Sequence, residues 1–556
     1  MKGSFSLIEQ DQLSTEDSLL LDTLEENIRI SFNTFVSDLC IENKLDSFSL
    51  LLSNANRNTY ASKPYSLFSR LLLLENKINN EQYPEKIYVS SKEIYNIATQ
   101  IVENREIPIV IKKRDPNIYF KVFKNITVSL YFQTIYFILS RLLDMKRIPE
   151  GPIIFLDTFI FKDTFSSEGG FIDRYYTGYD DYLTDDEKDS IWYSPTIIDI
   201  KNPVDLFNTW KNQKRSKKNF FCEEALLGLS DYLKSFFLST YLYKSVTFIP
   251  RFRDYDVSGY LRSELKKEIC SPSLVKAINK YLYIKKLSNK VQIIKAINWH
   301  ENQDIDRAIN LSFKKYLPKL QIYGYQGYVS PRSDLHKTPT EFEFDQGTLP
   351  NVIGVLSESD VVYKTNLCPK QEFKIAPALR FSHLHKLSKS MDHSLRENIF
   401  VPLPADINDA TRLIQFSSNF VSDISNHYQF VIKIHPKYTF EDLSFLIPEL
   451  SHSSFVITDN SVGDCLKDAF VVFSSGSTAC VEAYSLGLPV GILSNSSGLT
   501  MNPIWATGDE LFSIIYSQQD LKDLLKYASA SGKRNIRSDQ FFHKVDKEEV
   551  RKIFTN

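Results

Sequence analysis

Short apolar runs alternate with stretches of helical periodicity over most of the chain. The runs in its first two thirds that predict strands are KIYVSS, IPIVIKK (107–113), GPIIFLDTFIF (151–161), VQIIKAINW (291–299), LQIYGYQGYV (320–329), NVIGVLS (351–357) and FKIAPALR (373–380). Amphipathic segments such as KEIYNIATQIVE lie between them. Strands that alternate with helices predict a mostly parallel, doubly wound α/β sheet.

The same alternation starts again near residue 398. Its strand candidates are NIFVPLP (398–404), QFVIKIHPK (429–437), FVITDN (455–460), AFVVFSS (469–475) and LPVGIL (488–493). We therefore expect an α/β chain with a polar-faced helical region at 1–83 and two Rossmann-like domains, at 84–381 and 382–556. Sheets of this kind bind ligands beyond the carboxyl ends of their strands, so two such domains predict a ligand cleft between them.

Two segments fit this plan less simply. The longest apolar stretch, TVSLYFQTIYFIL (127–139), is too short to span a bilayer and contains Gln133. We expect it to be a buried helix, with shallow membrane contact as the alternative. Residues 165–220 are rich in loops and aromatic side chains, and the aromatic residues near 171–193 could stack on a sugar or belong to the core.

Composition excludes several classes of function. The 556 residues include 66 basic and 68 acidic side chains, so the net charge of −2 predicts no nucleic-acid partner. The six cysteines form no CxxC pair, which argues against zinc sites and disulfides. The N-terminus does not have the pattern of a signal peptide, and we expect a cytoplasmic protein.

The stretch FSSGSTACVEAYSLGLPV (473–490) holds the first candidate site. Four hydroxyl residues and one glycine lie between a strand and a helix: Ser474, Ser475, Gly476, Ser477 and Thr478. A helix N-terminus offers free N–H groups to a phosphate, and glycine permits close approach of the backbone. Simple capping of the helix would need only one of these residues.

Two further candidates belong to the same half of the chain. His435 ends a strand candidate, and Pro436 and Lys437 follow it. The histidine is expected at the same sheet edge as the serines, where it could donate to a phosphate oxygen. Glu482 shares a helical face with Thr478 and could accept hydrogen bonds from ribose hydroxyls, unless it is an ordinary solvated glutamate.

In the first domain the segment NWHENQDIDRA (298–308) places Glu301 at a strand-to-helix turn. A carboxylate there could act as a general base, or it could complement the helix dipole as Asp304 and Asp306 would. Gln326 and Arg380 follow neighbouring strand candidates and could line the same cleft. Asp157 is a weaker candidate.

The pair IKIHP and FSSGSTACVEAYSLGLPV resembles the C-terminal nucleotide domain of GT-B glycosyltransferases. The His-Pro followed by a serine cluster is similar to bacterial sialyltransferases and Kdo transferases. Together with NWHENQDIDRA, YGYQGYV and PALRF, the segments resemble surface-carbohydrate proteins of capsule, O-antigen and lipopolysaccharide biosynthesis. The resemblance covers roughly residues 290 to 500.

This resemblance implies a metal-independent glycosyltransferase that needs no cofactor beyond its nucleotide-sugar donor, CMP-Kdo or a CMP-nonulosonic acid. It implies that His435 and the hydroxyl cluster hold the nucleotide phosphate and that Glu301 is the base. The acidic motif of sialyltransferases is absent at Glu301, which leaves the donor sugar open. The acceptor would be a glycan, soluble or lipid-linked, with peripheral association at the inner membrane. The alternatives are a UDP-sugar epimerase of the same fold and a non-catalytic nucleotide-sugar-binding protein.

Overall fold

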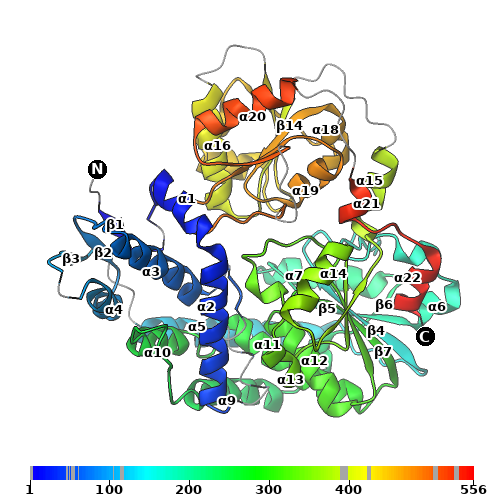
Figure 1. Cartoon of the computed structure of the whole chain (residues 1–556). Coiled ribbons are helices and arrows are strands. Elements are labelled where there is room, and N and C mark those ends of the chain that lie inside the picture. The colour runs from blue at the N-terminus through cyan, green and yellow to red at the C-terminus, as the bar shows by residue number, and fades with distance from the viewer. Residues whose placement is uncertain are drawn as a thin grey trace.

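A computed structural model describes residues 4–9, 11–45, 48, 51, 57–59, 62–103, 105–112, 118–388, 398–421, 428–504, 511–530 and 537–555. Three parallel sheets organise these residues, and the two larger ones share the order of their first six strands (Figure 1).

The larger sheet lies in the N-terminal half of the molecule and has the order β10-β9-β8-β7-β4-β5-β6. Its strands are β4 (Ile153–Ile160), β5 (Ile191–Ile197), β6 (Asn219–Phe220), β7 (Ile293–Trp299), β8 (Gln321–Tyr325), β9 (Val352–Val355) and β10 (Glu372–Ile375). Counted along the chain from β4, this order is 3-2-1-4-5-6-7. The order reverses between β4 and β7, which is where doubly wound sheets bind their ligands.

The C-terminal sheet has the order β13-β12-β11-β14-β15-β16, which is 3-2-1-4-5-6 along the chain. Its strands are β11 (Asn398–Pro402), β12 (Gln429–Lys433), β13 (Phe455–Ile457), β14 (Ala469–Ser474), β15 (Val490–Leu493) and β16 (Phe512–Ile515). The expected α/β fold with two Rossmann-like units is thus confirmed, and the arrangement is GT-B-like. The reversal point of this sheet lies between β11 and β14.

Helices cover these sheets. Those of the N-terminal half are α5 (Ile118–Leu142), α6 (Asp185–Ser190), α7 (Pro203–Arg215), α8 (Glu223–Leu226), α9 (Leu229–Ser245), α10 (Ser258–Lys267), α11 (Pro272–Ser288), α12 (Asp304–Tyr316), α13 (Glu341–Asp345) and α14 (Glu358–Leu367). Those of the C-terminal half are α15 (Ser382–Leu387), α16 (Ile407–Val421), α17 (Phe440–Leu446), α18 (Val462–Asp468), α19 (Thr478–Ser485), α20 (Gln518–Ala530) and α21 (Ser538–Phe541). The last helix in the chain is α22 (Lys547–Phe554).

The prediction that the first Rossmann-like domain starts at residue 84 is wrong. The strand candidates near 87 and 109 do not join the large sheet but form a separate one with the N-terminus. This small sheet is β1 (Phe5–Ser6), β2 (Ile87–Val89) and β3 (Ile109–Ile111), in that order. It packs with the helices α1 (Thr15–Thr23), α2 (Glu25–Glu42), α3 (Lys63–Asn79) and α4 (Lys92–Val102). Strands of two or three residues bury too little alone, so their pairing partner decides which unit they join.

The end of the second domain also differs from the expected range 382–556. Helix α22 returns to the N-terminal half and buries Val550, Ile553 and Phe554 in its core. The Phe554 ring lies 4.4 Å from that of Tyr179. Figure 1 shows α22 and the C-terminus beside β4 and β6, far from the C-terminal sheet. Residues 389–397, near the expected boundary at 381/382, lie outside the described residues.

Two more sequence-based expectations meet a different structure. The segment at 165–220, expected to be loop-rich, contains β5 and α7. Strand β16 was not among the strands predicted from the sequence. The stretch 127–139, expected to be buried, belongs to helix α5, in which only Ser129, Gln133 and Ser140 are buried. Of the described helices, α5 is the one long and apolar enough to cross a membrane by length and composition, and only 11% of its most apolar window is buried.

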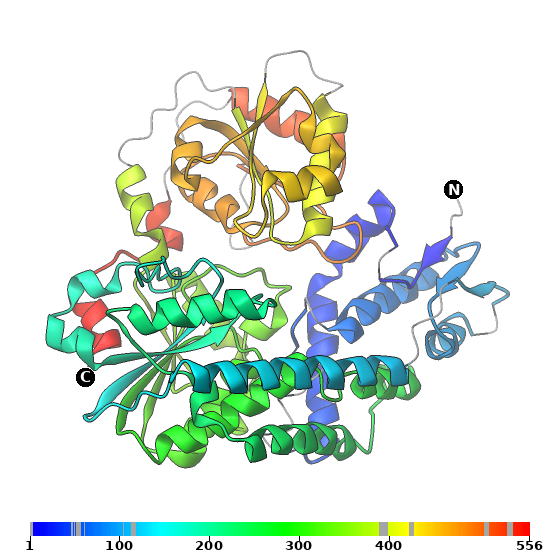
Figure 2. The same cartoon turned by 180° about the vertical axis from the view of Figure 1, so that it is seen from behind.

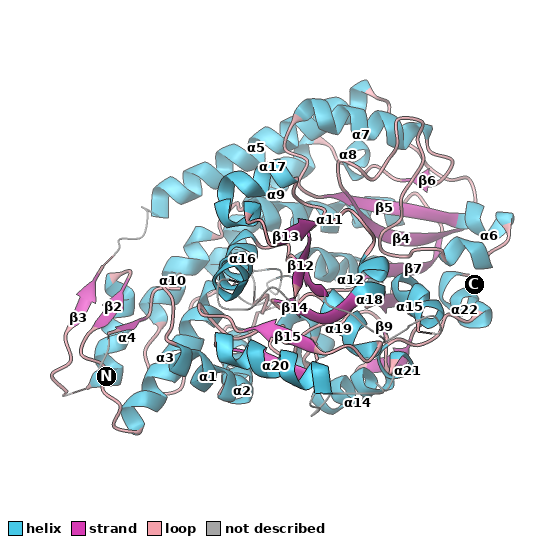
Figure 3. Ribbon diagram, turned by 90° about the horizontal axis from the view of Figure 1, so that it is seen from above, coloured by secondary structure: helices cyan, strands magenta, loops and turns pink. Residues whose placement is uncertain are grey.

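The carboxyl edges of the two sheets are turned toward each other. The loop after β8 meets the loop after β15, where the Ser333 hydroxyl donates to the Met501 sulfur at 3.3 Å. In Figure 3, seen from above, strands β12 to β15 of the C-terminal sheet lie beside β4, β5 and β7 of the N-terminal sheet. Loops that follow strands of the two units therefore meet at this point.

Candidate functional site

The connection from β14 to α19 lies at the reversal point of the C-terminal sheet. Ser474 ends β14, and its hydroxyl donates to the carbonyl of Pro402, the last residue of β11, at 2.7 Å. This bond joins the two strands that flank the reversal point. Ser474, predicted to bind a phosphate, therefore already has a structural partner.

The residues after Ser474 form a tight turn into the helix. The Ser475 hydroxyl oxygen is buried and has no hydrogen-bond partner among the described residues. Gly476 has a φ of 78°, and a Cβ added there would lie 2.0 Å from the Met501 carbonyl oxygen. Ser477 is the N-cap, since its hydroxyl accepts from the Ala479 N–H at 3.3 Å, and Thr478 opens the helix. The turn thus leaves one buried hydroxyl beside the positive end of a helix.

His435 lies at the same carboxyl edge, two residues beyond β12. Because β11 lies between β12 and β14, about 10 Å separates the ends of the two outer strands. The His435 Nδ1 accepts from the Lys437 N–H at 3.2 Å, so the proton of the neutral ring is placed on Nε2. Burial, and secondarily Lys437, lower the pKa of His435. The imidazole is therefore a neutral donor at pH 7.

Glu482 does not lie at the open edge but in the buried part of α19, with 8% of its surface exposed. Its Oε2 lies 3.3 Å from the Nε2 of His383 in α15. The hydrogen bond to Glu482 raises the pKa of His383 above its usual value. Sequence reasoning missed His383, because only the fold brings α15 to α19. The predicted ribose contact of Glu482 competes with this ion pair.

At the N-terminal sheet, Glu301 follows β7 and is held from two sides. Its Oε1 accepts from the Trp299 indole N–H at 2.9 Å and its Oε2 from the Gln303 side-chain amide at 2.7 Å. The guanidinium of the exposed Arg380 lies 5.6 Å from the centre of the Trp299 ring. The structure thus brings Glu301 and Arg380, predicted separately, to the same tryptophan.

Asp306 has the structural role that the sequence suggested. Its Oδ2 accepts from the backbone N–H groups of Glu301 and Gln303, at 2.9 and 3.1 Å, at the start of α12. It therefore fixes the turn that carries Glu301. Burial raises the pKa of Asp306 well above its usual range.

Gln326 is buried and already bonded. Its Oε1 accepts from the Lys364 ammonium at 2.6 Å, and its amide N–H donates to the Lys337 carbonyl at 3.0 Å. These partners account for Gln326 without a substrate, so its predicted contact with a ligand receives no support from the geometry.

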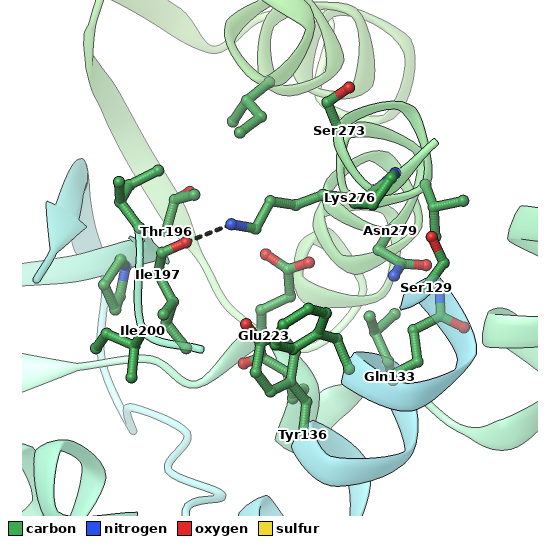
Figure 4. Close-up of a pocket in the computed structure, with 18 of the residues that line it drawn as sticks. Ser129, Gln133, Tyr136, Thr196, Ile197, Ile200, Glu223, Ser273, Lys276 and Asn279 are labelled. Carbon is green, nitrogen blue, oxygen red and sulfur yellow. Dashed lines mark hydrogen bonds between the residues drawn. The ribbon is translucent and has the colours of Figure 1, made fainter. Parts of the chain in front are cut away.

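A cavity of about 410 Å³ lies at the carboxyl end of β5, enclosed by α5, α8 and α11 (Figure 4). Polar atoms from three of these elements line it without hydrogen-bond partners in the described structure: Gln133 Oε1, Thr196 Oγ1 and Asn279 Oδ1. The Lys276 ammonium crosses the cavity from α11 and donates to the Ile197 carbonyl. No sequence motif marks this cavity, since its lining comes from segments far apart in the chain.

Buried charges surround the floor of this cavity. The Glu223 carboxylate lies 2.9 Å from the fully buried Lys280 ammonium. Burial raises the pKa of Asp157 to about 7, and burial with the neighbouring Glu223 raises the pKa of Glu224 to about 7. The floor of the cavity therefore contains one buried ion pair, Glu223 with Lys280, and two carboxyl groups with a pKa of about 7.

The cavity and the predicted catalytic carboxylate share one residue. Gln303 lines the cavity, and its side-chain amide is the group that donates to Glu301. A molecule in the cavity would therefore lie near Glu301. The described residues contain no group of three or more His, Cys, Asp or Glu side chains that could hold a metal ion.

No protein-family model matches the sequence. No curated protein matches it either. Solved structures with a similar arrangement include the UDP-GlcNAc 2-epimerases of Rickettsia bellii and of Neisseria meningitidis bound to UDP-GlcNAc, and MurG of Acinetobacter baumannii.

Each of these similarities is partial. The Rickettsia enzyme has 11% identity over 72% of this chain and 94% of its own, with a TM-score of 0.41. The Neisseria enzyme has 10% identity over 72% and 94%, with a TM-score of 0.40. MurG has 7% identity over 72% and 95%, with a TM-score of 0.37. Because these TM-scores are below 0.5, the similarities say nothing about activity. The fold is assigned from this chain's own strand order, and the chemistry from its own residues.

Proposed function

We propose that this chain is an enzyme that acts on a nucleotide sugar and binds the nucleotide phosphate at the turn from Ser475 to Thr478. The observation that carries the proposal is the buried, unpartnered Ser475 hydroxyl at the reversal point of the C-terminal sheet. A phosphate there would accept from that hydroxyl and from the first N–H groups of α19. Gly476 provides the backbone conformation that aims the turn.

His435 and Lys437 extend this site along the sheet edge. The neutral His435 donates from Nε2, and Lys437 adds a positive charge at an exposed position. The strand spacing of about 10 Å between the two clusters is wider than one phosphate group. A ligand that touches both must therefore extend beyond its phosphate group, as a nucleotide sugar does.

The reaction that fits the rest of the molecule is glycosyl transfer to a hydroxyl. Glu301 accepts the proton of the acceptor hydroxyl, whose oxygen forms a bond to the anomeric carbon. The bond from that carbon to the phosphate oxygen breaks, and the nucleotide leaves with the bonding electron pair. The cavity beside Glu301 holds the acceptor, since its unpartnered oxygens call for hydroxyl or amide donors on a ligand.

For the donor and the acceptor we keep the assignments that the sequence resemblance implies. The donor is CMP-Kdo or a CMP-nonulosonic acid, and the acceptor is a glycan of a bacterial surface polymer or its lipid-linked precursor. The UDP-sugar epimerase is the alternative, because the same phosphate turn would serve a UDP-sugar. An epimerase requires no acceptor, so the acceptor-sized cavity beside Glu301 favours transfer.

Nucleotide binding is tested by thermal shift and calorimetry with CMP, CDP, UDP and GDP. The wild type should be stabilised by one of them, because a ligand that binds only the native state raises the melting temperature. Ser475→Ala and His435→Ala should each weaken that binding by roughly tenfold or more. Ser529→Ala is the matched control, because Ser529 lies at the opposite edge of the same sheet beside Tyr428. Undiminished affinity in S475A would refute the phosphate site.

The reaction itself is tested with the nucleotide sugar that binds. Hydrolysis or transfer that Glu301→Gln abolishes, with nucleotide affinity kept, supports the transferase. Conversion of UDP-GlcNAc without any acceptor would instead establish the epimerase. Binding with no turnover of any donor in the presence of glycan acceptors would leave a non-catalytic binding protein.

A further inference from the structure

Helix α5 exposes a large apolar face. Its buried side chains are Ser129, Gln133 and Ser140, and apolar residues such as Tyr136 and Leu139 are partly buried beside them. Its exposed side chains include Phe120, Phe123, Tyr131, Ile138 and Leu142, and Phe123 has 67% of its surface exposed. A surface helix of a globular domain normally turns a polar face to solvent.

Helix α9 also exposes an apolar stripe. Leu229, Leu233, Phe237 and Tyr241 are exposed at four-residue spacing, so they form one stripe, and Phe237 has 76% of its surface exposed. Tyr232, Ser235, Ser239 and Leu242 are buried on the other side of the helix. Two such helices in one molecule indicate a shared surface rather than scattered apolar residues.

The two helices lie side by side. The Gln133 side-chain amide donates to the Ser235 hydroxyl at 3.2 Å, and the rings of Phe137 and Tyr232 are 6.1 Å apart. Figures 2 and 3 both show α5 and α9 adjacent along the outer edge of the N-terminal half. With 25 and 17 residues the helices are about 37 and 25 Å long. We call the outward side of the pair the α5–α9 face.

Positive charge flanks this face. Helix α5 contains Lys121, Lys124 and Arg141 and no acidic residue. In α9, Lys234 and Lys244 are exposed beside the stripe, whereas the single acid, Asp231, is paired with Lys286. An apolar stripe with lysines beside it matches the interface of a bilayer that contains anionic lipids.

We propose that the α5–α9 face docks flat on the surface of an anionic lipid bilayer. The lysines contact lipid phosphates, and the aromatic and aliphatic side chains enter the boundary between headgroups and acyl chains. The inward sides of the same helices supply Ser129, Gln133 and Tyr232 to the cavity described above. The docking itself is independent of the proposed function, but it would hold that cavity close to the membrane.

The geometry favours docking over the two other arrangements. Helix α5 lies on the bilayer rather than across it, because its polar side is bonded into the fold. Asn125 donates to the Lys267 carbonyl at 2.9 Å and Ser129 to the Cys270 carbonyl at 2.9 Å. A second copy of this chain on the same face would bring lysines toward lysines, which is unfavourable.

The test is flotation of the full-length protein with vesicles of phosphatidylcholine, with and without about 30% phosphatidylglycerol. The wild type should bind the anionic vesicles, and high salt should weaken the binding. The pair Phe123→Glu and Phe237→Glu should lower the partition coefficient about tenfold or more. The control pair is Phe445→Glu and Val362→Glu, two exposed apolar positions on other helices, which should bind as the wild type does.

A second pair, Lys124→Glu and Lys234→Glu, changes only exposed charges and should remove the preference for anionic vesicles. Circular dichroism and thermal unfolding check that each variant is folded. Three results would overturn the proposal: a wild type that floats with neither vesicle, equal binding by the phenylalanine pair, or a wild-type dimer or protein complex that this pair dissociates.

Discussion

The hydroxyl groups of Ser474, Ser475 and Ser477 do three different things although they are neighbours in the sequence. Ser474 bonds to β11, Ser477 caps α19, and Ser475 is buried without a partner in the described structure. The sequence alone predicted a surplus of hydroxyls for one helix cap. The coordinates decide which hydroxyl is the surplus one.

Gly476 is the residue of this turn that tolerates substitution least. In Gly476→Ala the new Cβ would meet the Met501 carbonyl oxygen, and the left-handed φ adds roughly 1–2 kcal/mol. We expect a lower melting temperature and a loss of nucleotide binding, measured together by thermal shift with and without the nucleotide.

Gly498→Ala is the matched control in the neighbouring loop, since the nearest atom to its added Cβ is Asn495 Nδ2 at 3.5 Å. It should leave both quantities nearly unchanged. If G476A binds nucleotide as the wild type does, the turn does not need its observed conformation and the phosphate site is wrong.

At the scale of elements, helices and strands carry polar groups where their patterns suggest none. Helix α5 has the apolar content of a core helix, yet its fully buried residues are Ser129, Gln133 and Ser140. Strand β4 is buried on both sides and still carries Asp157, against α8 and α11. Apolar content predicts that an element forms but not which of its faces is covered.

Asp157 gives this packing a dependence on pH. Its pKa is raised from 3.8 to about 7, so the folded protein binds a proton that the unfolded chain has released. The resulting loss of stability is absent at low pH, grows between pH 3.8 and about 7, and is complete above that. The free energy of unfolding of Asp157→Asn relative to the wild type should therefore rise by up to roughly 3 kcal/mol from pH 5 to pH 8.

Chemical denaturation at the two pH values measures this change. The exposed Asp181→Asn is the control and should show no such trend. A gain for D157N that is the same at pH 5 and pH 8 would mean that Asp157 stays ionised in the folded protein, paired with Lys280.

At the scale of the molecule, the ends of the chain join the units together. The N-terminal helical region contacts both Rossmann-like domains. Arg57 is 2.8 Å from the Glu343 carboxylate on one side, and Asp22 accepts from the Thr500 N–H at 2.8 Å on the other. At the other end of the chain, α22 crosses back to the N-terminal half, where Arg551 pairs with Glu187. These contacts hold the two sheet edges in their facing arrangement.

The crossing of α22 can be measured through Phe554, which is buried between Tyr176 and Tyr179. Phe554→Ala should cost roughly 3–5 kcal/mol, the usual loss for a buried phenylalanine. Calorimetry should show the loss in the transition of the N-terminal half, although the residue follows the C-terminal sheet in the sequence.

Phe445→Ala is the control for this loss, because Phe445 has 86% of its surface exposed and should change little. An equally small effect of F554A would show that α22 is not docked on the N-terminal half in solution.

Local patterns determined the elements of this protein and the end of the sheet at which each candidate residue would lie. Each of these patterns lies within a few neighbouring residues: an apolar run with period two or without interruption, a turn with a glycine, or a His-Pro after a strand. The apolar runs predict β7, β8, β11, β12 and β14. They also placed Glu301, His435 and the serine cluster at carboxyl ends of strands, as the structure has them.

Only the tertiary structure decided which sheet β2 and β3 join, where α22 docks and which side of α5 is exposed. It alone also brought His383 to Glu482, Lys280 to Glu223 and Gln133 to the cavity. Each of these depends on contacts between residues tens to hundreds of positions apart, and the free energy of such contacts comes from burial that no local pattern records. The same reason explains why Gln326, well placed along the sequence, has its hydrogen bonds taken by Lys364 and the Lys337 carbonyl.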